Sequence, residues 1–176
     1  MQHLCVETAR KINLGDPDWQ KNGVGKLYSY KYGFGAIDAF SFVEAAKTWK
    51  LVKPQAWAQS QTVRLNNGKI TKVSKKIYTY EGGVQIPKGG IKNTIEITKQ
   101  HLVDNNFEAL EHIDVRVWIE HNRRGDVEVS VTSPQGTTSI LAATRDRDDA
   151  KTGFPGWRFM SIKHWFVVPI STRTVF

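Results

Sequence analysis

An alternation of apolar and polar residues in the second half of the chain most constrains the fold. From Ile113 to Ile119 every second residue is Ile or Val, and the residues between them are Asp114, Arg116 and Trp118. The alternation returns from Val127 to Val131. Because successive side chains of a β-strand point to opposite faces, this period predicts two strands that each bury one face.

Turn-forming residues separate these strands from their neighbours. Arg124-Gly125-Asp126 lies between the two alternating segments, and Ser133-Pro134-Gln135-Gly136 carries proline at the second position of a four-residue turn. We expect further strands over residues 137–141 and 91–98, the latter with two isoleucines in phase. Short strands separated by turns about every ten residues are typical of a β-sandwich. The C-terminal half is therefore predicted to be mainly β.

A helix with one apolar face is expected near residue 40. Gly33 and Gly35 bracket Phe34 and permit turns that a side chain would forbid. Asp38 can then cap a helix by accepting from the free N–H groups of the first turn. The apolar residues at steps of three and four are Ala39, Phe42, Val43, Ala46 and Trp49. Residues 1–12 are also predicted to be helical.

Two long patterns resemble one known family. The order YS..YGFG.IDA...V..A..W in residues 28–49 looks like the end of the catalytic domain in kexin/furin-type proprotein convertases of the fungal type, which are subtilisin-like serine proteases. Residues 77–165, with HNRRGDVEVSVTSPQGTTSIL and GFPGWRFMSIKHW, are similar to the P domain, or Homo B domain, that follows it. The resemblance implies an incomplete jelly-roll β-sandwich preceded by a helical C-terminal remnant of an α/β subtilisin-like domain.

The resemblance divides the chain into three parts. Residues 1–49 are expected to be the remnant of the catalytic domain, residues 50–76 a linker, and residues 77–176 a truncated P domain. Residues 166–176, FVVPISTRTVF, match nothing in the family pattern and form an aberrant tail. Met1 is expected to be an internal methionine of a longer protein, and the sandwich is expected to lack its last strand or strands.

The activity that the resemblance implies is calcium-dependent endoproteolysis of precursor proteins after paired basic residues, in the late Golgi and secretory pathway. Subtilisin-type hydrolysis requires an aspartate, a histidine and a serine. The resemblance places all three before Met1, and no GTSxAAP-like serine segment occurs. We therefore expect no catalytic, cofactor or metal residue in this chain, which should be inactive alone. Calcium, the catalytic domain in cis and the proprotein substrates belong to the full-length family member.

Four apolar residues are expected to face a neighbouring domain. Phe42, Val43 and Trp49 lie on the helix face that needs a partner. Trp157 belongs to a segment that alternates poorly, which indicates large side chains on both faces of one strand. These four residues are the predicted domain interface.

Other sites are less favoured by the residues around them. Asp146, Asp148 and Asp149 could bind calcium, but no EF-hand loop occurs, and Arg145 and Arg147 are the expected partners. His112 and His121 lack a second cysteine and are improbable zinc ligands, since Cys5 is the only cysteine. Arg124-Gly125-Asp126 could mimic an integrin ligand, although a turn between strands explains the triplet.

The net charge of +8 would suit a nucleic-acid partner, but the rest of the sequence disfavours one. The basic residues between positions 61 and 76 carry neither interleaved aromatics nor a nucleic-acid-binding module, so a solvated linker is favoured. Neither a membrane span nor a signal peptide is visible. The rival function is that of a stand-alone β-sandwich binding module with a helical N-terminal appendage.

Overall fold

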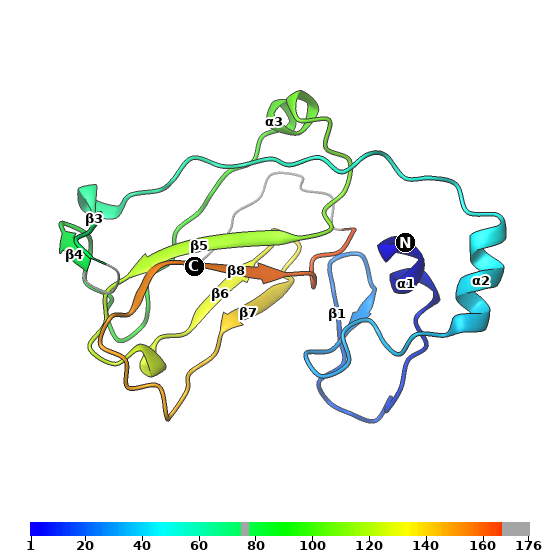
Figure 1. Ribbon diagram of the computed structural model, residues 1–176, viewed down its shortest axis with the longest axis horizontal. Helices are drawn as coiled ribbons and strands as arrows, with labels where there is room; N and C mark the ends of the chain where they lie inside the picture. The colour runs from blue at the N-terminus through cyan, green and yellow to red at the C-terminus, as the bar shows by residue number, and fades with distance from the viewer. Residues whose placement is uncertain (75–77, 167–176) are drawn as a thin grey trace.

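A computed structural model describes residues 1–74 and 78–166 of the protein. Two antiparallel strand pairs form its centre (Figure 1). In one pair, β5 (Ile113–Ile119) lies beside β8 (Phe154–Ser161), and in the other, β6 (Val129–Thr132) lies beside β7 (Thr138–Ala142). Both pairs contain a register shift, at Val117/Trp118 and at Val129/Ser130.

The alternating residues of these strands make the core, as the sequence predicts. Val131 is 1% exposed and Phe154 is 0% exposed, whereas Trp118 on the outer face of β5 is 42% exposed. The predicted bounds of the strand at Ile113–Ile119 are confirmed. The buried cluster consists of Val115, Val117, Val127, Val129, Val131, Ala142 and Phe154.

The turn between β6 and β7 is the predicted four-residue turn. The Gly136 N–H donates to the carbonyl oxygen of Ser133 at 2.9 Å, and the Ser133 N–H donates to that of Thr137 at 2.9 Å. The triplet between β5 and β6 forms a short 3-10 helix, η2 (Arg124–Asp126), in which Gly125 is buried.

The N-terminal segment contains α1 (Gln2–Thr8), β1 (Gln20–Lys21), β2 (Leu27–Tyr28) and α2 (Ala39–Lys47). Asp38 caps α2 as predicted, and its carboxylate accepts from the Ser41 N–H at 2.9 Å.

The predicted helix over residues 1–12 is wrong beyond Thr8. The Thr8 hydroxyl donates to the Leu4 carbonyl at 2.7 Å. Ala9 then turns to extended dihedrals, and Arg10 forms an antiparallel bridge with Ala36. That bridge requires an extended backbone, so α1 ends before it.

The middle of the chain is mostly irregular. Residues 50–64 run from α2 to the far end of the molecule (Figure 1), where η1 (Leu65–Asn67) leads into a hairpin of β3 (Lys69–Lys72) and β4 (Tyr78–Glu81). The expected linker therefore contains strand β3.

The predicted strand over residues 91–98 is wrong, because these residues are irregular and Thr98 caps α3 (Lys99–Asp104). A strand requires a backbone partner, which this segment does not find in the described structure.

The mainly β class is confirmed, since strands outnumber helices in the described residues. The jelly-roll arrangement and the origin of residues 1–49 as a catalytic-domain remnant stay predictions. The predicted tail over 166–176 lies outside the described residues after Phe166. Within the two ranges that are described, no helix is long and apolar enough to cross a membrane.

Candidate functional interface

The N-terminal segment packs against the residues that follow β8. Lys163, His164 and Trp165 form a turn closed by the Trp165 N–H, which donates to the Ile162 carbonyl at 3.1 Å. Their exposed fractions are 3%, 0% and 2%. A lysine, a histidine and a tryptophan buried together require covering groups, and residues of the segment 3–34 supply several of them. We call this contact the 22/163 interface.

Asn22 lies at the centre of the 22/163 interface and is 5% exposed. Its side-chain amide donates to the carbonyls of Lys163 at 3.1 Å and Trp165 at 3.0 Å. Its carbonyl oxygen accepts from the backbone N–H groups of Val24 and Lys26 at 3.1 and 3.0 Å. Because both amide hydrogens and both lone pairs are used, the side chain fixes its own turn and holds the far segment at the same time.

The glycine after Asn22 permits the approach to the β6–β7 turn. The Gly23 N–H donates to the Thr137 hydroxyl at 2.7 Å. A β-carbon at this position would lie 2.8 Å from the β-carbon of Gln135, which is closer than two carbons approach. The Asn-Gly pair is therefore required by the packing.

The buried ammonium group of Lys163 is bound by polar and aromatic groups of the N-terminal segment. It donates to the Gln20 side-chain oxygen at 2.8 Å and lies 4.9 Å from the Tyr30 ring centre and 6.0 Å from that of Tyr28. The Tyr30 hydroxyl in turn accepts from the Ile140 N–H at 2.8 Å. Burial, with the nearby Tyr30 and Asp18, raises the pKa of Tyr28, so this phenol stays neutral.

The Trp165 ring joins three parts of the chain. It meets the rings of His3, Phe34 and His112 edge-on at 5.2, 6.2 and 5.5 Å. His3 also forms a hydrogen-bonded pair with Glu111, with Nε2 and Oε1 2.6 Å apart. The contact between α1 and the segment before β5 is thus both aromatic and polar.

His164 is the most unusual group of the interface. It is fully buried, and neither ring nitrogen has a hydrogen-bond partner among the residues that the structure describes. Burial, together with the adjacent Lys163 charge, lowers the pKa of His164 to about 4. The imidazole is therefore neutral at physiological pH.

The structure does not bring the four sequence-predicted interface residues together. Phe42 and Trp49 are partly buried and Val43 is 55% exposed, all on or just after α2. Trp157 lies on β8, where it is 42% exposed and stacks with the Arg124 guanidinium at 4.6 Å. Whether they contact another domain stays a prediction.

Sequence reasoning missed the 22/163 interface. In the sequence, the Asn-Gly pair at 22–23 has the composition of an ordinary turn, and the residues Lys163 to Trp165 enter only the family resemblance. A signal was present in the sequence, because a lysine within a dense aromatic segment needs partners when that segment is buried.

Two of the three aspartates considered for calcium, Asp148 and Asp149 in the loop before β8, are paired with arginines. Asp148 accepts from Arg124 at 2.8 and 2.9 Å and from Arg145 at 3.1 Å, and these bonds lower its pKa to about 2. Asp149 pairs with Arg123 at 2.8 Å. The expectation that Arg145 binds this cluster is confirmed, but the second arginine on Asp148 is Arg124, not Arg147. The Arg124 guanidinium, on η2, binds both oxygens of the Asp148 carboxylate. The prediction from sequence considered only the arginines adjacent to the aspartates in the chain.

The same contacts explain the Arg124-Gly125-Asp126 triplet. The Arg124 side chain is held by Asp148 and Trp157, and Asp126 binds Arg123 at 2.7 Å. A β-carbon on Gly125 would lie 2.1 Å from the Arg145 carbonyl oxygen. All three residues of the triplet are therefore engaged in contacts within the folded chain.

The two histidines considered as zinc ligands make unrelated contacts. His121 contacts the Arg123 backbone through Nδ1, and His112 lies against Trp165. No group of three His, Cys, Asp or Glu side chains suited to a metal ion occurs in the described part of the chain.

Comparison with known proteins identifies the class of protein. Residues 110–168 match the proprotein convertase P-domain. The chain is 36% identical over 165 residues to Protease KEX1 of Kluyveromyces lactis, which covers 94% of this chain and 20% of that protein. It is 35% identical over 171 residues to the dibasic-processing endoprotease of Schizosaccharomyces pombe, covering 96% and 23%.

A human relative agrees with this class, and a solved structure matches the fold. Proprotein convertase subtilisin/kexin type 4 is 35% identical over 165 residues, covering 94% of this chain and 20% of its own. The serine protease of Aeromonas sobria matches the fold with a TM-score of 0.67 at 18% identity, covering 99% of this chain and 32% of that one. The resemblance to the kexin/furin-like proprotein convertases is thus confirmed, and residues 110–168 match the P-domain of that family. The chain spans about a fifth of the length of the curated relatives it matches.

Proposed function

We propose that this chain is the supporting part of a calcium-dependent serine endoprotease that processes precursor proteins after paired basic residues. It supplies the P-domain, the linker before it and, in residues 1–49, the C-terminal end of a subtilisin-like catalytic domain, and it contributes no catalytic residue. The similarity to relatives named kexin and dibasic-processing endoprotease supports this role. Calcium, the catalytic domain in cis, the proprotein substrates and a late Golgi or secretory location belong to the proposal for the whole protein.

The 22/163 interface is the observation that carries the proposal. Asn22, Lys163 and Trp165 are buried against one another, so the N-terminal segment and the strand pairs form one packed unit. A segment fixed in this way can hold a domain attached to it in one orientation. Unfolding of the attached domain would then also break its contacts with this packed unit. Those contacts would therefore raise the free energy of unfolding of the attached domain.

The apolar side chains of α2 give a second surface for the catalytic domain. None of the residues of α2 is buried, and Phe40 and Val43 are 75% and 55% exposed. A helix with an exposed apolar face is typical of an interface. We assign Phe42, Val43 and Trp49 to contacts with the catalytic domain.

The arrangement around Ser29 supports a structural role for this serine. Its hydroxyl donates to Asp18 at 2.6 Å and accepts from the N–H groups of Lys31 and Tyr32 at 3.0 and 3.1 Å. The residue is 0% exposed. A nucleophilic serine instead requires access to substrate and a histidine that accepts its proton.

A domain replacement tests the proposal. The corresponding region of Kluyveromyces lactis Protease KEX1 is replaced by this chain, and cleavage of a fluorogenic peptide ending in Lys-Arg is measured with calcium and with a chelator. We expect calcium-dependent activity in the fusion and only background in the chain alone. The Asn22→Ala fusion should lose activity at a lower temperature, whereas Gln55→Ala, at an exposed position, should not. An inactive but folded fusion, or calcium-dependent activity in the chain alone, would overturn the proposal.

The rival function, a stand-alone β-sandwich binding module, makes a different prediction. Such a module would bind a glycan, a protein or an integrin at micromolar affinity without any catalytic domain. The engagement of Arg124 with Asp148 and Trp157 disfavours the integrin version, because the guanidinium is already bound. Binding of the isolated chain to a glycan array would favour the rival.

A further inference from the structure

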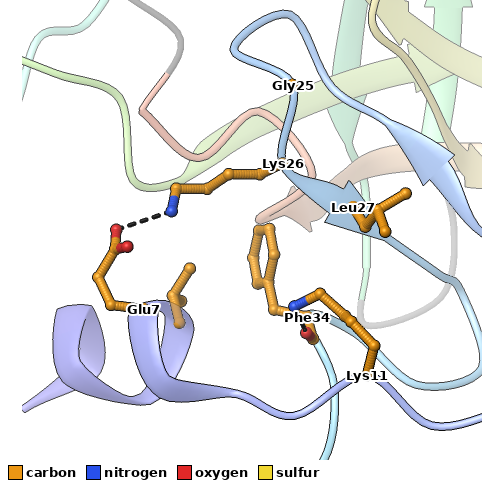
Figure 2. Close-up of a pocket in the computed structure, with 7 residues that line it drawn as sticks. Glu7, Lys11, Gly25, Lys26, Leu27 and Phe34 are labelled. Atoms are coloured by element: carbon orange, nitrogen blue, oxygen red, sulfur yellow. Dashed lines mark hydrogen bonds and ion pairs between the residues drawn. The ribbon is translucent and has the colours of Figure 1, made fainter.

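A cavity of about 260 Å³ lies between α1 and the start of β2 (Figure 2). Two of its lining residues, Lys26 and Phe34, also contact Asn22 and Trp165 of the 22/163 interface, but nothing in the proposed function uses the cavity itself. Figure 2 shows Glu7 of α1 and Lys26 facing each other across the opening, with the Phe34 ring between that pair and Lys11 in this view.

The inner wall of the cavity is apolar and held in place. Phe34 is 7% exposed, and its ring packs edge-on against Tyr28 at 5.4 Å and Trp165 at 6.2 Å. Val6 of α1 and Leu27 of β2 complete the wall. The wall therefore offers a rigid apolar surface, which a ligand can cover without first ordering it.

The rim of the cavity carries more positive than negative charge. The Lys26 ammonium and the Glu7 carboxylate form an ion pair at 2.8 Å. The Lys11 ammonium donates to backbone carbonyls, to that of Phe34 at 2.5 Å and that of Ala9 at 3.4 Å. These carbonyls orient the Lys11 ammonium but do not neutralise it, so one positive charge remains uncompensated among the lining side chains.

The two lysines repel each other at this site. Burial, and next the positive charge of Lys26, lower the pKa of Lys11, while Glu7 partly opposes this effect. An anion placed at the rim would relieve the repulsion and would stabilise both ammonium groups. A cation would add to the repulsion and is excluded by the same argument.

We infer that this cavity binds a small monocarboxylate with an apolar or aromatic body. The body covers Phe34 and Leu27, and the carboxylate lies at the rim where Lys11 and Lys26 face it. One uncompensated charge suits a monoanion, whereas a polyanion would leave the apolar wall uncovered and its own charge unmatched. The same chemical group occurs in free aromatic acids and at the C-terminus of a peptide that ends in an apolar residue.

A titration of the 176-residue chain with phenylacetate tests the site. Amide chemical shifts of Gly25, Lys26 and Phe34 should move together, with a dissociation constant on the order of 1 mM, which is typical for a ligand of about ten heavy atoms. Phenylacetamide has nearly the same shape and no charge, and it should bind at least about five-fold more weakly. Equal affinities for the acid and the amide would overturn the proposal, as would the absence of saturable shifts.

Two variants of one ion pair separate charge from structure. Glu7→Gln removes the competing carboxylate and should tighten phenylacetate binding, while Lys26→Gln removes a cation and should weaken it, each by about five-fold. Both changes break the same ion pair, so a purely structural effect would move both affinities in the same direction. The matched controls Glu44→Gln and Lys47→Gln break the ion pair on α2, at 2.6 Å, and should change neither.

The pH dependence and a peptide pair give the remaining results. Phenylacetate affinity should fall as the pH rises through the lowered pKa of Lys11, and Lys11→Met should weaken binding at neutral pH.

Acetyl-Gly-Phe with a free carboxylate, compared with its amide, distinguishes a peptide C-terminus from a free aromatic acid as the source of the ligand. Tighter binding of the peptide acid than of phenylacetate indicates a peptide C-terminus, and weaker binding indicates a free acid. Failure of both acids would overturn this inference and leave the proposed function unaffected.

Discussion

The side-chain amide of Asn22 donates to the carbonyls of both Lys163 and Trp165, at 3.1 and 3.0 Å. It joins positions that are 141 residues or more apart in the sequence. The pair Asn22 and Lys163 also brings together β1 and the turn after β8, because Lys163 reaches Gln20 of β1. A single buried amide thus connects the first and last parts of the described chain, and the predictions below begin there.

Asn22→Ala should destabilise the folded chain. The change leaves the buried carbonyls of Lys163 and Trp165 without their donor, and a buried polar group left unsatisfied costs about 1–3 kcal/mol. The free energy of unfolding is measured by urea denaturation at pH 7. Gln55→Ala, at an exposed position, serves as the control. A loss in Asn22→Ala no larger than that of the control would show that the interface contributes nothing to stability.

Phe154→Ala should have a larger effect than any surface change. Phe154 is 0% exposed and packs against Trp157 and Phe159 with ring centres 5.3 and 5.5 Å apart. Truncating such a residue costs about 3–5 kcal/mol because it leaves a cavity in the core. Thermal melting followed by circular dichroism checks this result. A cost below about 1 kcal/mol would indicate that the two strand pairs do not share a core.

Acid should weaken the fold through His164. Its pKa is 6.5 in a model peptide and about 4 in the folded chain, so the unfolded state takes up a proton first as the pH falls. Stability should therefore be highest above pH 6.5 and should fall between pH 6.5 and 4, by roughly 3 kcal/mol. Urea denaturation at pH 7, 5.5 and 4 measures this loss.

A variant without the titrating group gives the control for this pH dependence. His164→Phe keeps a buried aromatic ring and cannot take up a proton, so its stability should vary less over the same pH range. If His164→Phe and the unchanged chain lose stability in parallel, His164 is not the group responsible.

Asp148 should act at still lower pH. Its pKa is lowered from 3.8 to about 2, first by the hydrogen bonds from Arg124. A carboxyl group with a depressed pKa contributes stability above its unfolded pKa, and this contribution is lost as the pH falls from 3.8 to about 2. Asp148→Asn should lower the melting temperature at pH 7 and should flatten its dependence on pH in that acidic window. Asp146→Asn is the matched control, because Arg123 contacts Asp146 through its backbone carbonyl, which the substitution leaves in place.

Val43→Lys should leave the stability of the chain nearly unchanged while disturbing the proposed contact of α2 with the catalytic domain. Val43 is 55% exposed on α2, and surface substitutions of this kind usually change stability by less than about 0.5 kcal/mol. In the fusion with the catalytic domain of the Kluyveromyces lactis protease, the introduced charge should be buried without a partner and should reduce activity. Equal activity in the two fusions would show that this face of α2 remains open in the protease.

Elements whose cause is local could be predicted from the order of the amino acids. The strand from Ile113 to Ile119 has its predicted bounds because the period-two alternation and burial of one face act on the same few residues. The cap at Asp38 and the turn at Ser133 to Gly136 follow from chemistry within four residues. The family resemblance was equally readable from sequence, since it rests on ordered motifs.

Pairings between distant residues could not be predicted in this way, because they depend on how the whole chain folds. The segment 91–98 has the composition of a strand, but a strand needs a backbone partner, and its outcome depended on where other strands lie. Arg124 rather than Arg147 binds Asp148 because η2 places a guanidinium beside that carboxylate. The burial of Asn22 against Lys163 and Trp165 depended on the path of the whole chain, because hydrogen bonds between distant segments leave no period or spacing in the sequence.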